Sequence, residues 1–360
     1  MKRTLNNLSR LKNHDTTATN NTPSSPAFKD MEPFVQINNF IKKYNLITKD
    51  SHIILGLSGG PDSVFLLHFL TELLHAGKIK KLTAAHLDHE WRKDSSKDTQ
   101  FCRNIAKKYK VPLAEGKISD LCLKLKFSGS KEELGRRARR YFLEKIKKEE
   151  QADLIALAHH AQDQQETFFI RLIRGSALSG LTAMKPKYGP YIRPLLEINK
   201  KDIIDFLHQN NLPYLVDPSN TSEEFLRNRI RKFVLPALKK CDDRFDTKFK
   251  ETLERLSQTD QFLQALAAET FNKLSTENKG VFFVNIKELL SLAPVLQYTV
   301  VMHWLCRQKV KFPVSESFLD EILKFLHQPG SKEHQIHHSW SLIKKKGIVH
   351  IRLLPEKSAS

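Results

Sequence analysis

The sequence predicts an α/β protein in which a Rossmann-like, doubly wound parallel sheet is followed by a mainly helical C-terminal domain. Three observations lead to this prediction. Short aliphatic runs alternate with stretches of helical apolar spacing up to about residue 174, and this alternation gives a parallel sheet covered on both faces. A glycine-rich turn joins the first of these runs to the helix after it. Beyond about residue 222 the apolar spacing is helical almost throughout.

Each element follows from a local pattern. An amphipathic helix is expected over residues 33–46, and the apolar run 53–57 indicates a strand buried on both faces. We then expect helix 64–74, strand 82–87, helix 95–110, a short strand near 112, charged helix 131–149, strand 154–158 and helix 162–174. In the C-terminal domain we expect helices over 222–238, 246–274, 286–307 and 315–326, and a closing β-hairpin with a basic turn at 344–347.

Composition sets the scale and suggests a partner. The chain has 360 residues, of which 40% are hydrophobic, and this indicates about two domains with real cores. Lys and Arg number 59 against 40 Asp and Glu, a net charge of +19. Such a surplus favours a polyanionic partner, nucleic acid ahead of an acidic membrane surface. The alternative is a basic protein whose charge serves only solubility.

Cysteine spacing excludes several classes of protein. The four cysteines contain no CxxC pair, which argues against a disulfide framework, a zinc knuckle and a cysteine-held iron–sulfur cluster. They are Cys102, Cys122, Cys241 and Cys306.

The termini and domain limits follow from composition. No run of about 18 apolar residues exists, so we expect a cytoplasmic protein with no membrane partner. Residues 1–30 are polar and poor in acids, which predicts a disordered extension, with an organelle transit peptide as the alternative. The α/β domain is expected over 31–222 and the helical domain over 223–360. Whether the protein forms a homodimer stays open.

The strongest local signal is the turn Ser58-Gly59-Gly60-Pro61-Asp62-Ser63 between a strand and a helix. Its glycines allow positive φ and close approach to an anion, and Pro61 loses no donor that a helix start needs. The free amides of the first helical turn and the helix dipole would then face that anion. Asp62 suits a nearby cation, so we expect a Mg²⁺-linked role. A plain capped strand–turn–helix is the alternative. The Lys-Ser/Thr ending of a Walker loop is absent.

This hexapeptide resembles the loop of the N-type ATP pyrophosphatases, the PP-loop superfamily. The resemblance implies a PP-loop ATPase fold whose loop holds pyrophosphate while the α-phosphate of ATP is attacked. Further stretches in matching order and spacing make the chain similar to the tRNA(Ile)-lysidine synthetase family, strongly over residues 50–235. They are residues 86–92, 136–141, 158–167, 171–175, 193–195, 217–220 and 227–229.

The lysidine synthetase resemblance implies a two-step reaction with ATP and Mg²⁺ as cofactors. The C2 oxygen of the first anticodon cytidine of tRNA(Ile) with a CAU anticodon attacks the α-phosphate of ATP, releasing pyrophosphate. The amine of free L-lysine then displaces AMP and gives lysidine. The lysine amine must be neutral to attack, so a nearby base is needed.

Two carboxylates are candidates for that chemistry. Asp163 and Glu166 are three residues apart and share a helix face just past a strand end. There they can hold an ammonium group, a Mg²⁺ ion or both; the alternative is that they only favour a helix N-terminus. With the resemblance, Asp62, Asp163 and Glu166 are the catalytic candidates, and Asp62 and Asp163 the candidate Mg²⁺ ligands.

The resemblance also implies contacts to ATP and to tRNA. ATP would meet residues 58–63, His86 and His159, although His86 could instead fix the loop. Arginines are expected to meet the RNA backbone, namely Arg137, Arg140, Arg171, Arg174, Arg193, Arg227 and Arg229. For the lysines of the C-terminal domain, which include Lys239, Lys240, Lys248, Lys250 and 344–346, a plain solvated side chain is the favoured interpretation.

The chain departs from the family pattern at Glu90, Trp91, Arg136 and Gln162. These departures put the role of the loop after the second strand, and any metal role at position 162, in question. Two other functions remain as alternatives. One is a tRNA-thiolating PP-loop enzyme, against which the scattered cysteines count. The other is a catalytically silent RNA-binding homologue.

Overall fold

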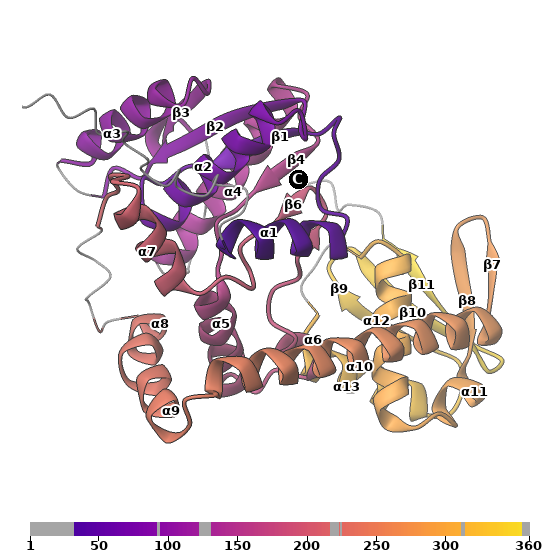
Figure 1. Ribbon diagram of the computed structural model, residues 1–360. Coiled ribbons are helices and arrows are strands. Elements are labelled where there is room, and N and C mark those ends of the chain that lie inside the picture. Colours follow the sequence, from indigo (N-terminus) through magenta and orange to yellow (C-terminus); the bar gives the residue numbers. More distant parts are fainter. Residues whose placement is uncertain are drawn as a thin grey trace, which may run out of the picture.

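The computed structural model describes residues 32–91, 94–121, 131–216, 223, 225–310 and 314–354. The predicted N-terminal extension, the expected boundary at 222 and the segment 217–220 of the resemblance lie outside these residues. The first part of the chain is an alternation of helices and strands (Figure 1). In order these are α1 (Glu32–Lys43), β1 (His52–Gly56), α2 (Pro61–His75), β2 (Lys81–Asp88), α3 (Ser95–Lys108), β3 (Leu113–Lys117), α4 (Lys131–Glu149), β4 (Leu154–Ala156), α5 (Ala161–Ile173), α6 (Leu178–Leu181), β5 (Lys187–Tyr188), β6 (Tyr191–Ile192) and α7 (Lys200–Gln209).

These strands form a six-stranded sheet in the order β3-β2-β1-β4-β6-β5. All neighbouring pairs are parallel except β5 with β6. The chain extends the sheet from β1 through β2 to β3, and then returns to place β4 on the other side of β1. The predicted doubly wound sheet is therefore confirmed, and its switch point lies between β1 and β4, where such sheets bind ligands.

Burial explains why β1 is continuously apolar. Ile53, Ile54 and Leu55 are fully buried. Ile53 and Leu55 belong to the core shared with α1, α2 and α7, whereas Ile54 belongs to the core on the α4 side. Helices thus cover both faces of the sheet, and a strand between two cores has no solvent face for polar residues.

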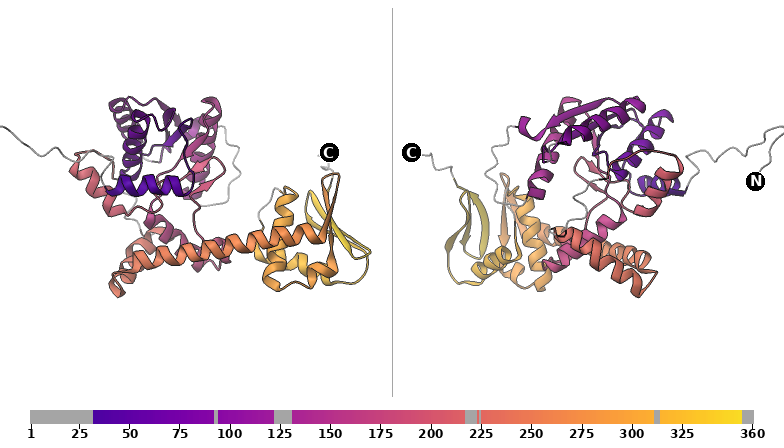
Figure 2. Two further views of the ribbon diagram at one scale, coloured as in Figure 1. Left: turned by 45° about the vertical axis from the view of Figure 1, so that its right-hand side comes forward. Right: turned by 90° about the vertical axis from the view of Figure 1, so that its left-hand side faces the viewer.

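The rest of the described chain begins with a helical stretch and continues into a mixed unit. Its elements are α8 (Leu226–Arg229), a π-helical turn (Ile230–Val234), α9 (Leu235–Cys241), α10 (Phe245–Leu274), β7 (Ser275–Asn278), β8 (Val281–Asn285), α11 (Ile286–Leu290), α12 (Pro294–Arg307), α13 (Glu316–His327), β9 (Lys332–His337), β10 (Trp340–Lys345) and β11 (Ile348–Leu353). Figure 2 shows α10 running from beneath the first domain to the C-terminal sheet. No helix among the residues described is both long enough and apolar enough to span a bilayer.

The C-terminal unit is richer in strands than the sequence predicts. The expected hairpin is β10–β11, and it belongs to a five-stranded antiparallel sheet in the order β7-β8-β11-β10-β9. The strands β7 and β8 were not expected, and the predicted helix 286–307 is two helices, since Pro294 starts a new one. Trp304 on α12 and Leu342 on β10 lie buried in one core between the helices and the sheet.

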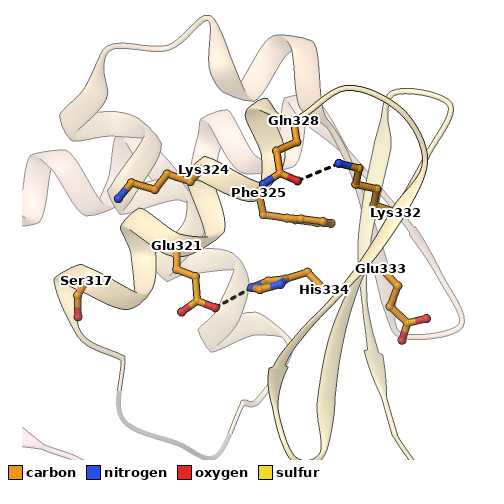
Figure 3. Close-up of a pocket in the computed structure, with 8 residues that line it drawn as sticks. All are labelled: Ser317, Glu321, Lys324, Phe325, Gln328, Lys332, Glu333 and His334. Carbon is orange, nitrogen blue, oxygen red and sulfur yellow. Dashed lines mark hydrogen bonds and ion pairs between the residues drawn. The ribbon is translucent and has the colours of Figure 1, made fainter.

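A hollow lies between α13 and β9, where Glu321 pairs with His334 (Figure 3). It has a volume of about 350 Å³, and the rings of Phe325 and His334 stack there with centroids 5.0 Å apart. Nearby, Lys344 is buried and donates to the carbonyls of Phe325, Leu326 and Gln328 at the end of α13. Lys344 therefore stabilises the fold and is not a surface residue that could meet RNA phosphates.

Candidate functional site

The predicted anion loop lies at the carboxyl end of β1 and continues into α2. Gly59 has φ +80°, and Gly60 is the extended residue before Pro61 opens the helix. The Ser63 hydroxyl donates to the Gly60 carbonyl (2.9 Å) and lies 3.1 Å from the Ser58 hydroxyl. This network fixes the turn so that the helix N-terminus opens toward the switch point of the sheet, as an anion site requires.

Gly59 is needed for space as well as for its backbone conformation. A Cβ at this position would lie 2.7 Å from Leu215 Cδ1 and 3.3 Å from Cys102 Sγ. The Leu215 amide donates to the Gly59 carbonyl (2.9 Å). The segment before residues 217–220 therefore packs directly on the loop.

Asp62 in the first turn of α2 forms an ion pair that the sequence did not indicate. The Lys200 ammonium lies 2.5 Å from Asp62 Oδ1 and 2.7 Å from Oδ2. His160 lies between Asp62 and Asp163, with its Nε2 atom 3.8 Å from Asp62 Oδ1 and 3.5 Å from Asp163 Oδ2. Two of the three predicted catalytic carboxylates are thus brought together around one histidine.

Asp163 also shapes the start of α5. Its Oδ2 accepts the backbone amide of His160 (2.9 Å), so it caps the helix from inside the first turn. Burial opposes ionisation of Asp163, but His160, His159 and Arg227 outweigh it and lower its pKa. Burial lowers the pKa of His159 to about 4. At neutral pH the centre of the site therefore holds an anionic Asp163 beside a neutral His159.

Glu166 lies one turn further along α5 and is fully buried. The Arg231 guanidinium donates to both of its oxygens, at 2.6 and 3.1 Å, and Arg227 Nε lies 3.4 Å from Oε2. Burial raises the pKa of Glu166, although both arginines oppose that shift. Arg231 reaches Glu166 from the π-helical turn. π-helical turns are rare and often accompany functional sites.

His86 near the end of β2 supports the chain before the loop, and Trp91 after β2 packs against α4. His86 Nδ1 lies 2.9 Å from the Leu57 carbonyl, so His86 fixes the chain just before the loop. Its buried Nε2 atom has no hydrogen-bond partner among the described residues. Trp91 stacks on His89 with centroids 4.7 Å apart, and it fits only because position 135 is Gly, where a Cβ would lie 2.4 Å from the indole.

Gln162, another departure from the family pattern, connects two helices of the site. Its Oε1 accepts the Lys200 amide (2.8 Å), which ties the N-terminus of α5 to that of α7. The side chain at 162 thus helps to place Lys200 on the loop.

The predicted tRNA-binding arginines fall into two groups. Arg171 and Arg193 are held by backbone carbonyls: Arg171 donates to Gly180 and Ala183 (2.6 and 2.8 Å), and Arg193 donates to Lys185 (2.8 Å). Their guanidinium groups order the segment after α5, and Arg227 faces Glu166. The remaining four are exposed on the surface, namely Arg137, Arg140, Arg174 and Arg229.

Sequence reasoning missed Lys200 and treated Arg231 only as part of a basic segment with Arg227, Arg229 and Lys232 that would meet a nucleic acid backbone. No local pattern marks Lys200, because its partner is 138 residues away in the chain. A signal for Arg231 did exist, since Arg227 and Arg231 are four apart and share a helix face.

Protein ligands for a metal are few at this site. Within the described part of the chain, no group of three or more His, Cys, Asp or Glu side chains could hold a metal ion. Mg²⁺ in phosphate-transfer sites is commonly held by one or two carboxylates together with substrate phosphates. Asp62 on the loop, with Asp163 across His160, fits that kind of site.

A strand, the loop SGGPDS and a helix at the switch point of a parallel sheet define the PP-loop class of nucleotide-binding domains. The family model described as "PP-loop domain" matches residues 31–238, and the chain belongs to this family. Its curated relatives include tRNA(Ile)-lysidine synthases. One from Bacillus cereus is 33% identical, covering 82% of this chain and 64% of its own length. One from Bacillus subtilis is 36% identical, covering 72% and 56%. The lysidine synthetase resemblance seen in the motifs is thus confirmed.

The chain spans 64% or less of these relatives' own length. Among solved structures, the U34-tRNA thiolase NcsA from Methanococcus maripaludis, with its 4Fe–4S cluster, matches with a TM-score of 0.53. It is 19% identical, and the match covers 62% of this chain and 78% of the thiolase. This likeness supports the fold alone.

Proposed function

We propose that this protein uses ATP to join free lysine to C2 of the first anticodon cytidine of tRNA(Ile) with a CAU anticodon, giving lysidine, AMP and pyrophosphate. The observation that carries the proposal is the intact loop Ser58–Ser63, with Asp62 and Asp163 gathered at it, in a chain about one-third identical to tRNA(Ile)-lysidine synthases. The fold supports the assignment of the nucleotide site, and the similarity to these relatives supports the choice of substrate.

In this proposal the loop binds the β- and γ-phosphates of ATP. Its donors are the amides at the start of α2 and the exposed Ser58 hydroxyl, aided by the helix dipole, while the Ser63 hydroxyl holds the turn through the Gly60 carbonyl. His86 Nε2 and His159 are the candidate contacts to the rest of the nucleotide. Mg²⁺ held by Asp62, with Asp163 as the second candidate, would stabilise charge on the phosphates.

The two carboxylates of α5 suit different tasks because their environments move their pKa values in opposite directions. Asp163, with a lowered pKa, keeps its charge and suits an ammonium group or Mg²⁺. Glu166 is fully buried and both of its oxygens accept from Arg231, so Asp163 is the better candidate to meet the lysine amine, and Glu166 would position the arginines beside it. Arg231 and Arg227 would hold Glu166 in a fixed orientation.

The RNA is proposed to lie across the exposed arginines. Arg137, Arg140, Arg174 and Arg229 offer charge to phosphates. A cytidine in an anticodon loop is easier to extrude into a pocket than one in a duplex, because fewer stacking and pairing contacts are lost.

A labelled-lysine assay tests the proposal. The protein is mixed with ATP, Mg²⁺, radiolabelled lysine and a tRNA(Ile) transcript with a CAU anticodon; the control transcript has U at the first anticodon position. Lysine fixed only to the first transcript, with one AMP released per lysine, is the expected result. The Asp62→Ala variant should bind tRNA normally but release no AMP.

Other outcomes would favour the alternatives. AMP release without lysine incorporation would indicate the same activation with another nucleophile, as in thiolation. Cys102 beside the loop is a poor candidate for that role, because burial raises its pKa to about 12 and keeps the thiol protonated. Binding of tRNA without AMP release would indicate a silent RNA-binding homologue.

A further inference from the structure

The ion pair between Lys200 and Asp62 brings a second charged residue to the phosphate loop. Lys200 contacts both oxygens of Asp62, at 2.5 and 2.7 Å. The Asp62 side chain is 24% exposed and that of Lys200 is 35% exposed, so solvent and small ions can reach the pair. A cation therefore already occupies the carboxylate that is the first candidate for Mg²⁺.

Contacts of α7 with α5 and α2 hold Lys200 in this position. Lys200 is the first residue of α7, and its amide is held by Gln162 Oε1. Helix α7 packs on α2 through Phe206, whose ring lies 5.1 Å from that of Phe65. The next residue, Lys201, instead pairs with Asp205 on its own helix, and its side chain is 83% exposed. Of the two adjacent lysines, only Lys200 is turned onto the loop.

Charge balance explains why a cation is needed there. The loop is built to bind polyphosphate, and the ionised Asp62 in its first helical turn would repel that ligand at short range. Mg²⁺ can cancel the charge when it arrives with ATP, but the free protein needs another counter-ion. The adjacent imidazole of His160 lies 3.8 Å away and makes no hydrogen bond of ordinary length to Asp62.

We propose that Lys200 is a counter-ion of the nucleotide site, which neutralises Asp62 in the free protein and is displaced from it by the Mg²⁺ that accompanies ATP. This inference rests on the proposed ATP site. It adds a residue that sets the magnesium dependence of binding: Lys200 permits ATP to approach without metal, and Mg²⁺ must compete with its ammonium for Asp62.

Equilibrium binding of ATP to the full chain, measured calorimetrically in EDTA and in saturating Mg²⁺, tests this. Lys200→Met is expected to weaken ATP binding at least tenfold in EDTA and less than threefold in Mg²⁺. It should also lower the Mg²⁺ concentration that gives half-maximal ATP binding. The double variant Asp62→Asn/Lys200→Met should regain affinity in EDTA, because the charge that Lys200 balanced is gone.

Lys201→Met is the matched control and should resemble the unmodified protein in both buffers. An equal loss for Lys200→Met in both buffers would make Lys200 a permanent phosphate ligand and overturn the inference. An unchanged affinity in EDTA, or the same effect from Lys201→Met, would overturn it as well. Lys200→Arg, which keeps the charge, should preserve binding in EDTA, and a tenfold loss there would contradict the counter-ion role. If the unmodified protein binds no ATP in either buffer, the proposed function itself fails, and this inference with it.

Discussion

Arg231→Met is expected to destabilise the protein strongly, because it leaves the buried Glu166 carboxylate without its main partner. Arg231 makes two hydrogen bonds to that carboxylate, at 2.6 and 3.1 Å, and bonds to charged groups are worth about 1.5–3 kcal/mol each. The Arg231 side chain is 41% exposed, so water recovers part of the loss, and Arg227 remains 3.4 Å from Oε2. We expect the free energy of unfolding to fall by about 3 kcal/mol at neutral pH.

Urea denaturation followed by circular dichroism measures this loss, and its pH dependence identifies the cause. Burial already raises the pKa of Glu166 above its unfolded value, and removing Arg231 raises it further. When the pKa of a carboxyl group is higher in the folded than in the unfolded protein, the folded protein binds the proton more tightly. Its stabilising effect is complete below the unfolded pKa and is lost as the pH rises through the folded pKa. The penalty of Arg231→Met should therefore be larger at pH 8 than at pH 5.

The double variant Arg231→Met/Glu166→Gln tests whether the loss comes from the buried Glu166 charge or from the altered packing at position 231. It removes the buried charge along with its partner, so it should regain at least half of the lost stability. A penalty below about 1 kcal/mol for Arg231→Met, equal penalties at the two pH values, or simple additivity of the two changes would refute this reasoning.

Three further predictions concern single positions. Gly59→Ala should lower the free energy of unfolding by about 1–3 kcal/mol and weaken ATP binding, because its Cβ would meet Leu215 at 2.7 Å. Gly77→Ala, with φ +63° but open space, is the control that carries only backbone strain, and an equal loss there would refute the steric argument. Burial lowers the pKa of His68 to about 4. The folded protein holds His68 in its neutral form, whereas the unfolded chain takes up a proton below pH 6.5. The free energy of unfolding should therefore fall by up to about 3 kcal/mol as the pH drops from 6.5 toward 4. Denaturation of His68→Phe across that range should show a shallower slope, and an unchanged slope would contradict this. Lys344→Met should cost about 1–3 kcal/mol by leaving the last carbonyls of α13 unpaired, and unaltered urea denaturation would show that these bonds are unimportant.

The elements that the sequence predicted well are those with long, uninterrupted patterns. The helix expected over 131–149 matches α4 (Lys131–Glu149), and the strand over 53–57 matches β1 to within a residue. The strands that the sequence analysis missed in the C-terminal unit are short. β8 (Val281–Asn285) alternates between half-buried and buried residues over only five positions, and so short a pattern cannot be separated from the helical spacing around it.

In the candidate site, too, the sequence predicted the local features and not the contacts between distant segments. The sequence alone determined the phosphate loop, because residues 58–63 are contiguous and their turn is set by glycine, proline and the helix that follows. It also placed Asp163 and Glu166 on one face of a helix, since that depends only on a spacing of three. Such features are local, and a local pattern is visible without knowing the fold.

Only the tertiary structure decided which charges meet. Lys200 reaches Asp62 across 138 residues, and Arg231 reaches Glu166 across 65. Each pairing depends on how α7 and the π-helical turn pack against the sheet domain, which no spacing in the chain records. The same packing decided that Glu166 is buried and Asp62 partly exposed, and burial is what raises the pKa of Glu166.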